Sequence, residues 1–342
     1  MNPAAKFLAL EPARRDLVIE QAAIQRAISP VIMEKDFWVC WLLGVLFAEP
    51  VLGPHMVFKG GTSLSKVFGV IERFSEDIDL SVAPDFVGAD AAAFEKLDSR
   101  SKRDEAIRHM QALCLGKTKD VIAPVLEGAI AAALESRGQA WLSYEVDENA
   151  HAPVLRFHYP ASRQAGFAYL QRNVKLELGT LTDQQPIGRH LIRPWAADVF
   201  PAAFDDWRCE VTALELERSF WEKATILHAE YHRPPEQAMP DRYARHYADM
   251  ARLVVAAQGP VFMADKAQCE RVVAWKSRTF ARGWARYDLA RHGSFRLVPP
   301  AQRHAALARD YEAMRPMFLR EPVPFDELMR QLAEAEQTIN TM

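Results

Sequence analysis

Hydrophobic residues recur along the chain with two spacings, one typical of helices and one that alternates with polar residues as in strands. Both spacings occur before about residue 210, and the helical one predominates after it. In the first part, runs with helical spacing are interleaved with short runs in which apolar and polar residues alternate. The helical spacing predicts helices at residues 13–28, 31–47, 62–70, 91–115 and 120–136. The alternation predicts strands at residues 56–59, 77–82, 141–146, 154–159 and 173–179, whereas residues 180–210, with three prolines, are expected to be irregular.

The rest of the chain carries almost only helical patterns. They predict helices at residues 217–232, 241–257, 266–290 and 303–336. The breaks between them are the pairs Pro234-Pro235, Gly259-Pro260 and Pro299-Pro300. We therefore expect an α+β lobe over residues 1–210, with N-terminal helices and a sheet, and a mainly helical lobe over residues 211–342.

The charges of the whole chain nearly cancel. Its 342 residues include 42 Lys and Arg against 45 Asp and Glu, which gives a net charge of −3. This balance argues against a uniformly basic nucleic-acid coat and against an acidic disordered tail. With 49% hydrophobic residues, the chain is expected to bury a globular core.

Cysteine spacing and the length of apolar runs exclude further classes of protein. Four cysteines lie far apart with no CxxC pair, so neither a zinc site nor a disulfide framework is indicated. The chain has no run of about 18 apolar residues, and residues 1–15 carry charges where a signal peptide needs an apolar segment. We expect buried thiols in a cytoplasmic protein without a membrane partner.

Two aspartates point to a metal. Asp77 and Asp79 are two residues apart in a predicted strand, so their side chains project from the same face. Carboxylates this close repel each other unless a cation lies between them. A hard divalent ion such as Mg²⁺ takes oxygen ligands of this kind, so Asp77 and Asp79 are predicted to be metal ligands.

A glycine turn between the strand at 56–59 and the next helix points to phosphate. Gly60 and Gly61 let the backbone approach another group closely, and their N–H groups suit an anion. Thr62 and Ser63 add hydroxyl donors, and Lys66 lies about one turn further along. Because GxxxxGK[ST] and GxGxxG are both missing, this is neither a P-loop nor a Rossmann motif. The five residues are predicted to bind the phosphates of a nucleotide.

The combination of motifs resembles a known superfamily. A Gly-Gly turn followed by an Asp-Ile-Asp strand is similar to the defining motif of the polymerase-beta-like nucleotidyltransferases, with a somewhat longer interval between the two. FKGGTSLSK (58–66) and RFSEDIDL (73–80) more narrowly resemble the AbiEii-type abortive-infection nucleotidyltransferases, a toxin family related to the mycobacterial MenT-type toxins. Further matches are EKDFW (34–38), FWEK (220–223), H-x-x-x-H-R-P (228–234) and RHYADM (245–250).

The resemblance implies both a fold and an activity. The fold is an α+β polymerase-beta-like nucleotidyltransferase lobe with a mixed sheet, followed by a mainly helical lobe, with the site in the cleft between them. The activity is Mg²⁺- or Mn²⁺-dependent transfer of a nucleoside monophosphate from an NTP, with release of pyrophosphate. The resemblance also implies a toxin of a toxin–antitoxin (abortive infection, phage defence) system, which modifies the 3′ end of tRNA and is neutralised by a cognate antitoxin protein.

Four further residues gain catalytic or nucleotide-binding roles from the resemblance. Glu177, on the strand at 173–179, would be a general base or a second metal ligand. Lys223 would hold the triphosphate, Asp249 would be an active-site carboxylate and the alternative base, and Arg245 would contact the nucleotide. The structural alternatives are an exposed strand glutamate, a lysine at the rim of an apolar face, and an i, i+4 surface pair between Arg245 and Asp249.

The roles of two other pairs of residues are left open by the sequence. Lys35 and Asp36 lie in an aromatic-rich helix and serve either the site or a buried salt bridge. His228 and His232 have the i, i+4 spacing of a zinc pair without the HExxH order, so they are interpreted as packing or substrate-facing residues.

The nearly neutral charge of the whole chain conceals a basic region in the predicted helical lobe. Residues 265–320 hold 12 Lys and Arg against 5 Asp and Glu. The aromatic residues interleaved with these bases are Trp275, Phe280, Trp284, Tyr287 and Phe295. Cations suit a polynucleotide backbone and rings suit stacked bases, so an RNA acceptor is the predicted partner; a helical core with a solvated basic face is the alternative.

Three competing functions remain. They are nucleotidylation (AMPylation) of a protein side chain, an interaction protein whose site is catalytically inert, and nucleotidylation of a small molecule such as an antibiotic. The intact Asp77, Asp79 and Lys223 argue against an inert site, and a small-molecule acceptor would leave the basic region without a purpose.

Overall fold

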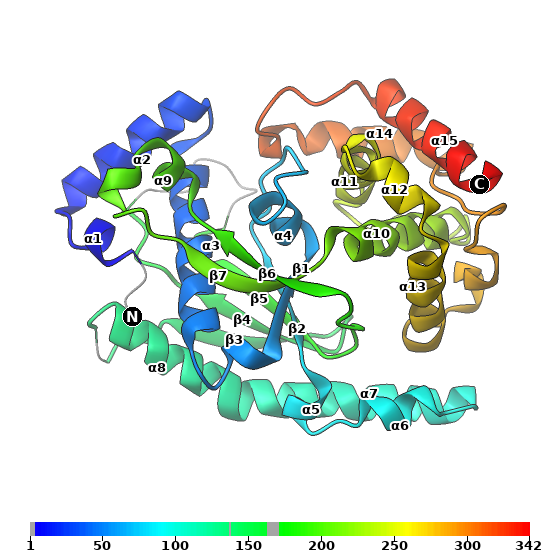
Figure 1. The fold of residues 1–342 in the computed structure, drawn as a ribbon, viewed down its shortest axis with the longest axis horizontal. Helices are drawn as coiled ribbons and strands as arrows, with labels where there is room; N and C mark the ends of the chain where they lie inside the picture. The colour runs from blue at the N-terminus through cyan, green and yellow to red at the C-terminus, as the bar shows by residue number, and fades with distance from the viewer. Residues whose placement is uncertain (1–3, 137, 163–170) are drawn as a thin grey trace. The chain divides into compact units, whose positions relative to one another are not determined.

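A computed structural model describes residues 4–136, 138–162 and 171–342 (Figure 1). The chain divides into two compact units. The first consists of Met1–Val67 and Ser75–Leu214, and the second of Phe68–Phe74 and Glu215–Met342. The predicted domain boundary after residue 210 falls inside a strand of the first unit, and the short segment Phe68–Phe74 joins the second unit although both its neighbours belong to the first.

The first unit is built around a mixed sheet, which has seven strands in the described residues (Figure 1). Their order across the sheet is β3 (Leu142–Asp147), β4 (Ala152–Phe157), β5 (Val174–Gly179), β2 (Ile78–Val82), β1 (Met56–Lys59), β7 (Cys209–Leu214) and β6 (Ile187–Ile192). The pairs β2–β5 and β1–β7 are parallel, and the other neighbours are antiparallel. The mixed sheet confirms the predicted α+β class.

The first unit also contains helices, one of which, α3 (Pro30–Ala48), is almost wholly buried. They are α1 (Ala5–Leu8), α2 (Pro12–Arg26), α3 (Pro30–Ala48), α4 (Gly60–Lys66), α5 (Pro84–Val87), α6 (Ala91–Glu95), α7 (Arg100–Lys117), α8 (Ala123–Ala133) and α9 (Trp195–Val199). The hydroxyl of Ser29 caps α3 and Pro30 occupies its first position, a favourable start for a helix. Helix α3 is apolar on all sides from Phe37 onward; it is buried from Ile32 to Leu46 and packs against β7, α2 and α8.

The second unit is mainly helical. Its helices are α10 (Leu216–Tyr231), α11 (Ala244–Val255), α12 (Gly259–Ala264), α13 (Lys266–Thr279), α14 (His304–Ala313) and α15 (Phe325–Thr341). Helix α10 packs against α11 and α13, and α11 also packs against α15. We call Phe68–Phe74 the strap, because it is hydrogen-bonded to the loop between α14 and α15 through Phe74 N to Met317 O (2.7 Å) and Leu319 N to Glu72 O (2.9 Å).

Four predictions of secondary structure were wrong. One is the single helix expected at 91–115, which is two helices, α6 and α7, separated by residues 96–99. The region 180–210 is not irregular: it contains β6 and α9, and β7 begins at Cys209. The strand β6 lies at the edge of the sheet and leaves Ile187 and Leu191 exposed, so its alternation did not stand out as a half-buried pattern. The helix expected at 266–290 ends at Thr279, and the one expected at 303–336 is two helices separated by prolines.

The four cysteines are free thiols and all are buried. In the part of the chain that the structure describes, no helix has the length and apolar character needed to cross a bilayer.

Candidate active site

The turn between β1 and α4 brings the backbone against a carboxylate. Gly60 has a φ of +79°, and a Cβ atom built on it would lie 1.9 Å from Oδ2 of Asp79. Both the backbone conformation and the lack of space therefore require glycine here. The antiparallel pairing of Lys59 with Asp79 across β1 and β2 fixes this close approach.

Asp77 and Asp79 lie on one side of the chain. Asp77 immediately precedes β2 and Asp79 lies within it; both are half-buried, whereas Ile78 and Leu80 between and beyond them are buried. In the parallel pairing of β2 with β5, Asp79 lies opposite Glu177. Because paired residues point to the same face of a sheet, the structure brings the three predicted carboxylates together.

The electrostatics of this group fit a divalent cation. Burial, reinforced by the charges of Glu76, Asp79 and Glu177, raises the pKa of Asp77 to about 6, and the ammonium of Lys175 only partly opposes this. The same Lys175 forms a short ion pair with Glu177. Within residues 4–136, 138–162 and 171–342, no three or more His, Cys, Asp or Glu side chains form a ready metal cage. Mg²⁺ usually takes one or two protein carboxylates with phosphates and water, so the Asp77–Asp79 pair fits it.

The hydroxyls of the glycine turn face inward. The Thr62 hydroxyl donates to the carbonyl oxygen of Asp77 and lies 2.9 Å from Ser75 Oγ, and Ser63 Oγ donates to Gly60 O at 3.3 Å. Both side chains are buried. They therefore shape the turn and hold Asp77, while the backbone N–H groups at Gly60–Ser63 are left as the candidates for phosphate.

Lys66 is engaged in a buried ion pair. Its Nζ lies 2.6 Å from Asp36 Oδ1 and 4.5 Å from the centre of the Trp195 ring, and its side chain is 4% exposed. The other oxygen of Asp36 accepts a hydrogen bond from Trp195 N at 2.7 Å. The arrangement assigns Lys66 to the packing of α4 against α3, and it gives no support to the predicted phosphate contact.

The neighbouring residues of α3 hold the segment that leads into Asp77. Lys35 Nζ lies 2.5 Å from Glu76 Oε2 and donates to Gln171 O at 2.9 Å. Glu34 accepts a hydrogen bond from Ser162 N at 2.8 Å. Of the two alternatives left open for Lys35 and Asp36, the structure shows buried salt bridges, and that of Lys35 is adjacent to the metal-binding candidates.

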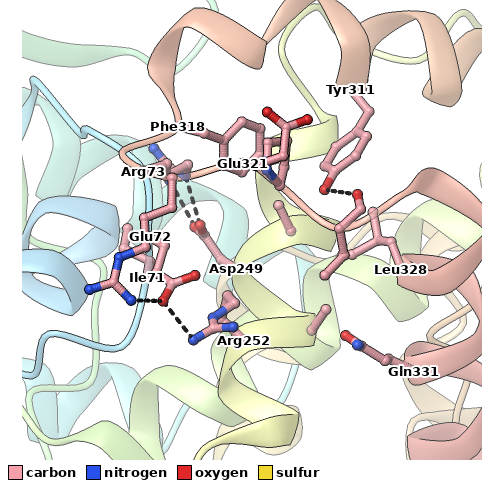
Figure 2. Close-up of a pocket in the computed structure, with 15 residues that line it drawn as sticks. Ile71, Glu72, Arg73, Asp249, Arg252, Tyr311, Phe318, Glu321, Leu328 and Gln331 are labelled. Atoms are coloured by element: carbon pink, nitrogen blue, oxygen red, sulfur yellow. Dashed lines mark hydrogen bonds and ion pairs between the residues drawn. The ribbon is translucent and has the colours of Figure 1, made fainter. Parts of the chain in front are cut away.

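The second unit contains a buried trio of charged residues. Arg73, in the strap, binds Asp249 with two parallel hydrogen bonds, Nε to Oδ1 at 2.7 Å and Nη2 to Oδ2 at 2.8 Å (Figure 2). Lys223, on α10, donates to the same Oδ2 at 2.8 Å. Arg73 was not among the site residues predicted from the sequence; its only signal was its place at the start of the RFSEDIDL match.

This trio fixes the protonation of Asp249. Burial alone would raise the pKa of Asp249, but the charges and hydrogen bonds of Arg73 and Lys223 outweigh burial and hold the pKa well below its usual range. Burial lowers the pKa of Lys223, with Asp249 opposing and Arg73 adding to this shift. A carboxylate held ionised by two cations is a poor proton acceptor. Glu177 is paired with one cation, Lys175, and 41% of its side chain is exposed.

Two further residues of α11 lie near the trio, and one of them, Arg245, adds a positive charge. Arg245 is exposed, and Asp249 binds Arg73 and Lys223 in place of the predicted i, i+4 pair with Arg245. Nδ1 of His246 lies 3.3 Å from Lys223 Nζ. Burial, with the charges of Lys223 and Arg245, lowers the pKa of His246 well below its usual value.

The predicted site residues thus form two groups. Gly60, Gly61, Asp77, Asp79 and Glu177 gather in the first unit. In the second unit, Asp249 and Lys223 gather with Arg73, and Arg245 lies one helical turn before Asp249.

The basic region of the second unit presents some of its predicted residues and buries others. Phe280 is 46% exposed, and Arg282 and Arg291 are exposed. Phe295, in contrast, is fully buried with its ring centre 5.6 Å from that of Trp221, so it belongs to the core.

The two histidines pack in the same core. His228 is fully buried, accepts a hydrogen bond from Arg296 N at Nδ1 (3.1 Å) and donates from Nε2 to Arg286 O (3.0 Å). Burial is the main reason why its pKa falls to about 4. Its ring lies 4.8 Å from that of His232. Both nitrogens of His228 are occupied, so packing is its role.

Comparison with known proteins gives the family. Residues 41–331 match the family described as Nucleotidyl transferase AbiEii toxin, Type IV TA system. The chain belongs to this family, which confirms the resemblance noted in its motifs; it is a nucleotidyltransferase and a toxin of a type IV toxin–antitoxin system.

Two solved structures are similar over nearly their whole lengths. JHP933 from Helicobacter pylori is 12% identical with a TM-score of 0.42, and the match covers 92% of this chain and 94% of that chain. MenT4, a nucleotidyltransferase toxin from Mycobacterium tuberculosis H37Rv, is 16% identical with a TM-score of 0.43, and the match covers 95% and 98%. No protein of curated description matches the sequence.

Proposed function

We propose that the protein transfers a nucleoside monophosphate from an NTP to an RNA acceptor, the 3′ end of tRNA, in the cytoplasm. The observation that carries the proposal is the group of carboxylates on β2 and β5, with Asp79 packed against the glycine turn. Asp77 and Asp79 would hold Mg²⁺ or Mn²⁺, and the backbone N–H groups of Gly60–Ser63 would bind phosphate oxygens. A bound metal ion would offset the negative charges of the phosphates and of these carboxylates.

Glu177 is the general base of the proposal. In the transfer, the 3′ hydroxyl oxygen of the acceptor bonds to the α-phosphorus, the bond between that phosphorus and the β-phosphate bridging oxygen breaks, and pyrophosphate leaves. The hydroxyl proton passes to the Glu177 carboxylate, which lies opposite Asp79 and keeps part of its surface exposed. Asp249 is held by two cations and has no part in this proton transfer.

The cationic group of the second unit is proposed to bind the triphosphate. Lys223 and Arg73 together carry two positive charges against the single carboxylate of Asp249, and Arg245 adds a third. Cations in such a site stabilise the negative charge of departing phosphates. Phe280, Arg282 and Arg291, exposed on the same unit, would contact RNA.

Transfer of label tests this proposal directly. The protein is incubated with Mg²⁺, total RNA and each NTP labelled at the α-phosphate, and the products are separated by size. We expect label on RNA of tRNA size, dependent on Mg²⁺, and none with Asp79→Ala, while Glu148→Gln, an exposed carboxylate in the turn after β3, matches the unmodified protein. Label on protein would favour side-chain nucleotidylation, and neither label nor Mg²⁺-dependent NTP binding would favour an inert interaction protein.

A further inference from the structure

Asp77 lies just outside the part of the sheet that positions its partners. The ladder of β2 with β5 starts at Ile78, and the ladder of β2 with β1 starts at Asp79. Strand pairing therefore fixes Asp79 directly, but it fixes Asp77 only through the residue that follows it. Because a metal ligand has to be held within about 0.5 Å of its productive position, Asp77 needs anchors of another kind.

A buried lysine of α3 anchors the residue before Asp77. Lys35 Nζ lies 2.5 Å from Glu76 Oε2, and the two side chains are 2% and 10% exposed. Glu76 is thus directed to α3, whereas Asp77 lies close enough to Asp79 and Glu177 for their charges to act on it. The ion pair at Glu76 therefore holds the backbone next to Asp77 from the side of the helix.

The same ammonium also reaches the strand that carries Glu177. Lys35 Nζ donates a hydrogen bond to the backbone oxygen of Gln171 at 2.9 Å, shortly before β5 begins at Val174. We call residues 75–77, before β2, and residues 171–173, before β5, the lead-in segments. Since β2 and β5 are parallel neighbours, both lead-in segments enter the sheet at the same end, and one lysine ties them together.

Stability alone is a weak reason for this ion pair. Apolar residues of similar volume often replace a buried ion pair with no loss of stability, and α3 is apolar from Phe37 onward. An apolar residue cannot donate to a carboxylate and to a backbone oxygen at once, whereas a lysine ammonium has three N–H donors on a long stem. The contacts of Lys35 therefore favour a role in holding the two lead-in segments together.

We propose that Lys35 is a positioning residue that keeps Asp77 in place beside Asp79 and Glu177 and thereby sets the affinity of these carboxylates for a divalent cation. The proposal rests on the metal role of Asp77 and Asp79 given above. Lys35 acts through Glu76 and through the backbone before β5. Residues that orient metal ligands in this indirect way are typically worth about 10–100-fold in metal affinity.

A neutral replacement of the ion pair separates positioning from stability. The double variant Lys35→Met/Glu76→Gln removes one charge of each sign, so the net charge near the site is unchanged and no lone buried charge remains. Its free energy of unfolding should stay close to that of the unmodified protein. Its affinity for Mn²⁺, titrated on the full chain and followed by electron paramagnetic resonance, should fall about tenfold. A double variant that keeps the Mn²⁺ affinity of the unmodified protein would overturn the proposal.

Matched controls separate the possible failures. Ile130→Ala opens a cavity at a fully buried position of α8, so it should lower stability and leave Mn²⁺ affinity unchanged. An equal loss of affinity in Ile130→Ala and in the double variant would overturn the proposal, because destabilisation alone would then explain it. If the double variant does not fold, Lys35→Gln/Glu76→Gln takes its place with the same two outcomes. Equal Mn²⁺ binding by Asp79→Ala and the unmodified protein would instead refute the proposed metal site itself.

Discussion

Each unit contains a cluster of charged side chains around an aspartate, and the pKa values of the two aspartates are shifted in opposite directions. In the first unit, Asp77 has a pKa raised to about 6 by burial and by three neighbouring carboxylates, and nearby Lys175 only partly offsets them. In the second, Asp249 is buried and has its pKa held low, because two cations share it. In the proposed function, the first group binds the metal ion and the second binds the triphosphate.

The same residue type is therefore expected to contribute oppositely to stability in the two units. An aspartate that repels its neighbours costs free energy in the folded protein, whereas an aspartate bound by buried cations stabilises it. Substitutions that remove one charge at a time separate the two situations.

The largest effect is expected for the proposed base. Glu177→Gln should lower the rate of transfer by about 10²–10⁴-fold, since the acceptor hydroxyl would lose its proton acceptor. The measurement is label transfer to RNA at saturating NTP. NTP affinity should change little, and a rate equal to that of the Glu148→Gln control would contradict the assignment.

The next effect concerns stability of the second unit. Asp249→Asn removes the carboxylate that buried Arg73 and Lys223 both bind, and we expect the free energy of unfolding to fall by about 3–5 kcal/mol. Urea unfolding monitored by circular dichroism gives the value. Asp288→Asn removes a carboxylate of the same unit that is 63% exposed and should change stability far less, because solvent screens its charge. Equal effects of the two substitutions would contradict the expected contribution of the buried ion pairs.

Asp77→Asn should raise the free energy of unfolding, whereas Asp249→Asn should lower it. In EDTA at pH 7.5 we expect it to stabilise the protein by at most about 3 kcal/mol while abolishing transfer, because one pKa unit is worth about 1.4 kcal/mol. Below the ordinary pKa of 3.8, Asp77 is protonated whether the protein is folded or not, so the variant gains nothing there. The gain should appear as pH rises from about 4 to about 6 and then stay constant.

Metal addition provides the control for this result. Mg²⁺ should raise the melting temperature of the unmodified protein and not that of Asp77→Asn. A variant that is less stable than the unmodified protein in EDTA at pH 7.5 would show that Asp77 is not repelled by its neighbours.

The smallest effect is expected on the RNA surface. Phe280→Ala should weaken RNA binding about fivefold through loss of one stacking platform. Arg282→Gln should reduce the slope of log affinity against log salt by about 0.7–0.9, the value for one lost phosphate contact. Filter binding at several salt concentrations measures both. Arg14→Gln, an exposed arginine of the first unit, is the control, and an equal change there would argue against this surface.

The parts of the molecule that the sequence predicted best are those in which local pattern and packing agree. Strand β5 alternates cleanly and is buried on one face only. Helix α3 is apolar on all sides from Phe37 onward and is buried on all sides as far as Leu46. The edge strand β6 lacks a buried face of its own, so its pattern gave no signal. Pro316, Pro322 and Pro324 lie between α14 and α15. The prediction of a single helix at 303–336 did not take these helix-breaking residues into account.

For the candidate site, the sequence indicated which residues belong to it more readily than which residues they pair with. The pairing of β2 with β5 brings Glu177 beside Asp79, which agrees with the role that the family resemblance implied for Glu177. Lys66 was expected to bind phosphate because it lies about one helical turn after the glycine turn. In the structure it is paired with Asp36, which is 30 residues away in the sequence. Arg73 and Asp249 are 176 residues apart, and no local pattern identifies such a pair. Long-range ion pairs depend on the assembled fold.

The strap makes the helical unit discontinuous in sequence. A fragment that starts at Glu215 lacks Phe68–Phe74, and with it the arginine that both oxygens of Asp249 bind. Cutting the gene at the Leu214–Glu215 border would therefore not yield the complete unit. A split version of the toxin would need the strap joined to the helical fragment through a designed linker, or a circular permutant whose new ends lie elsewhere.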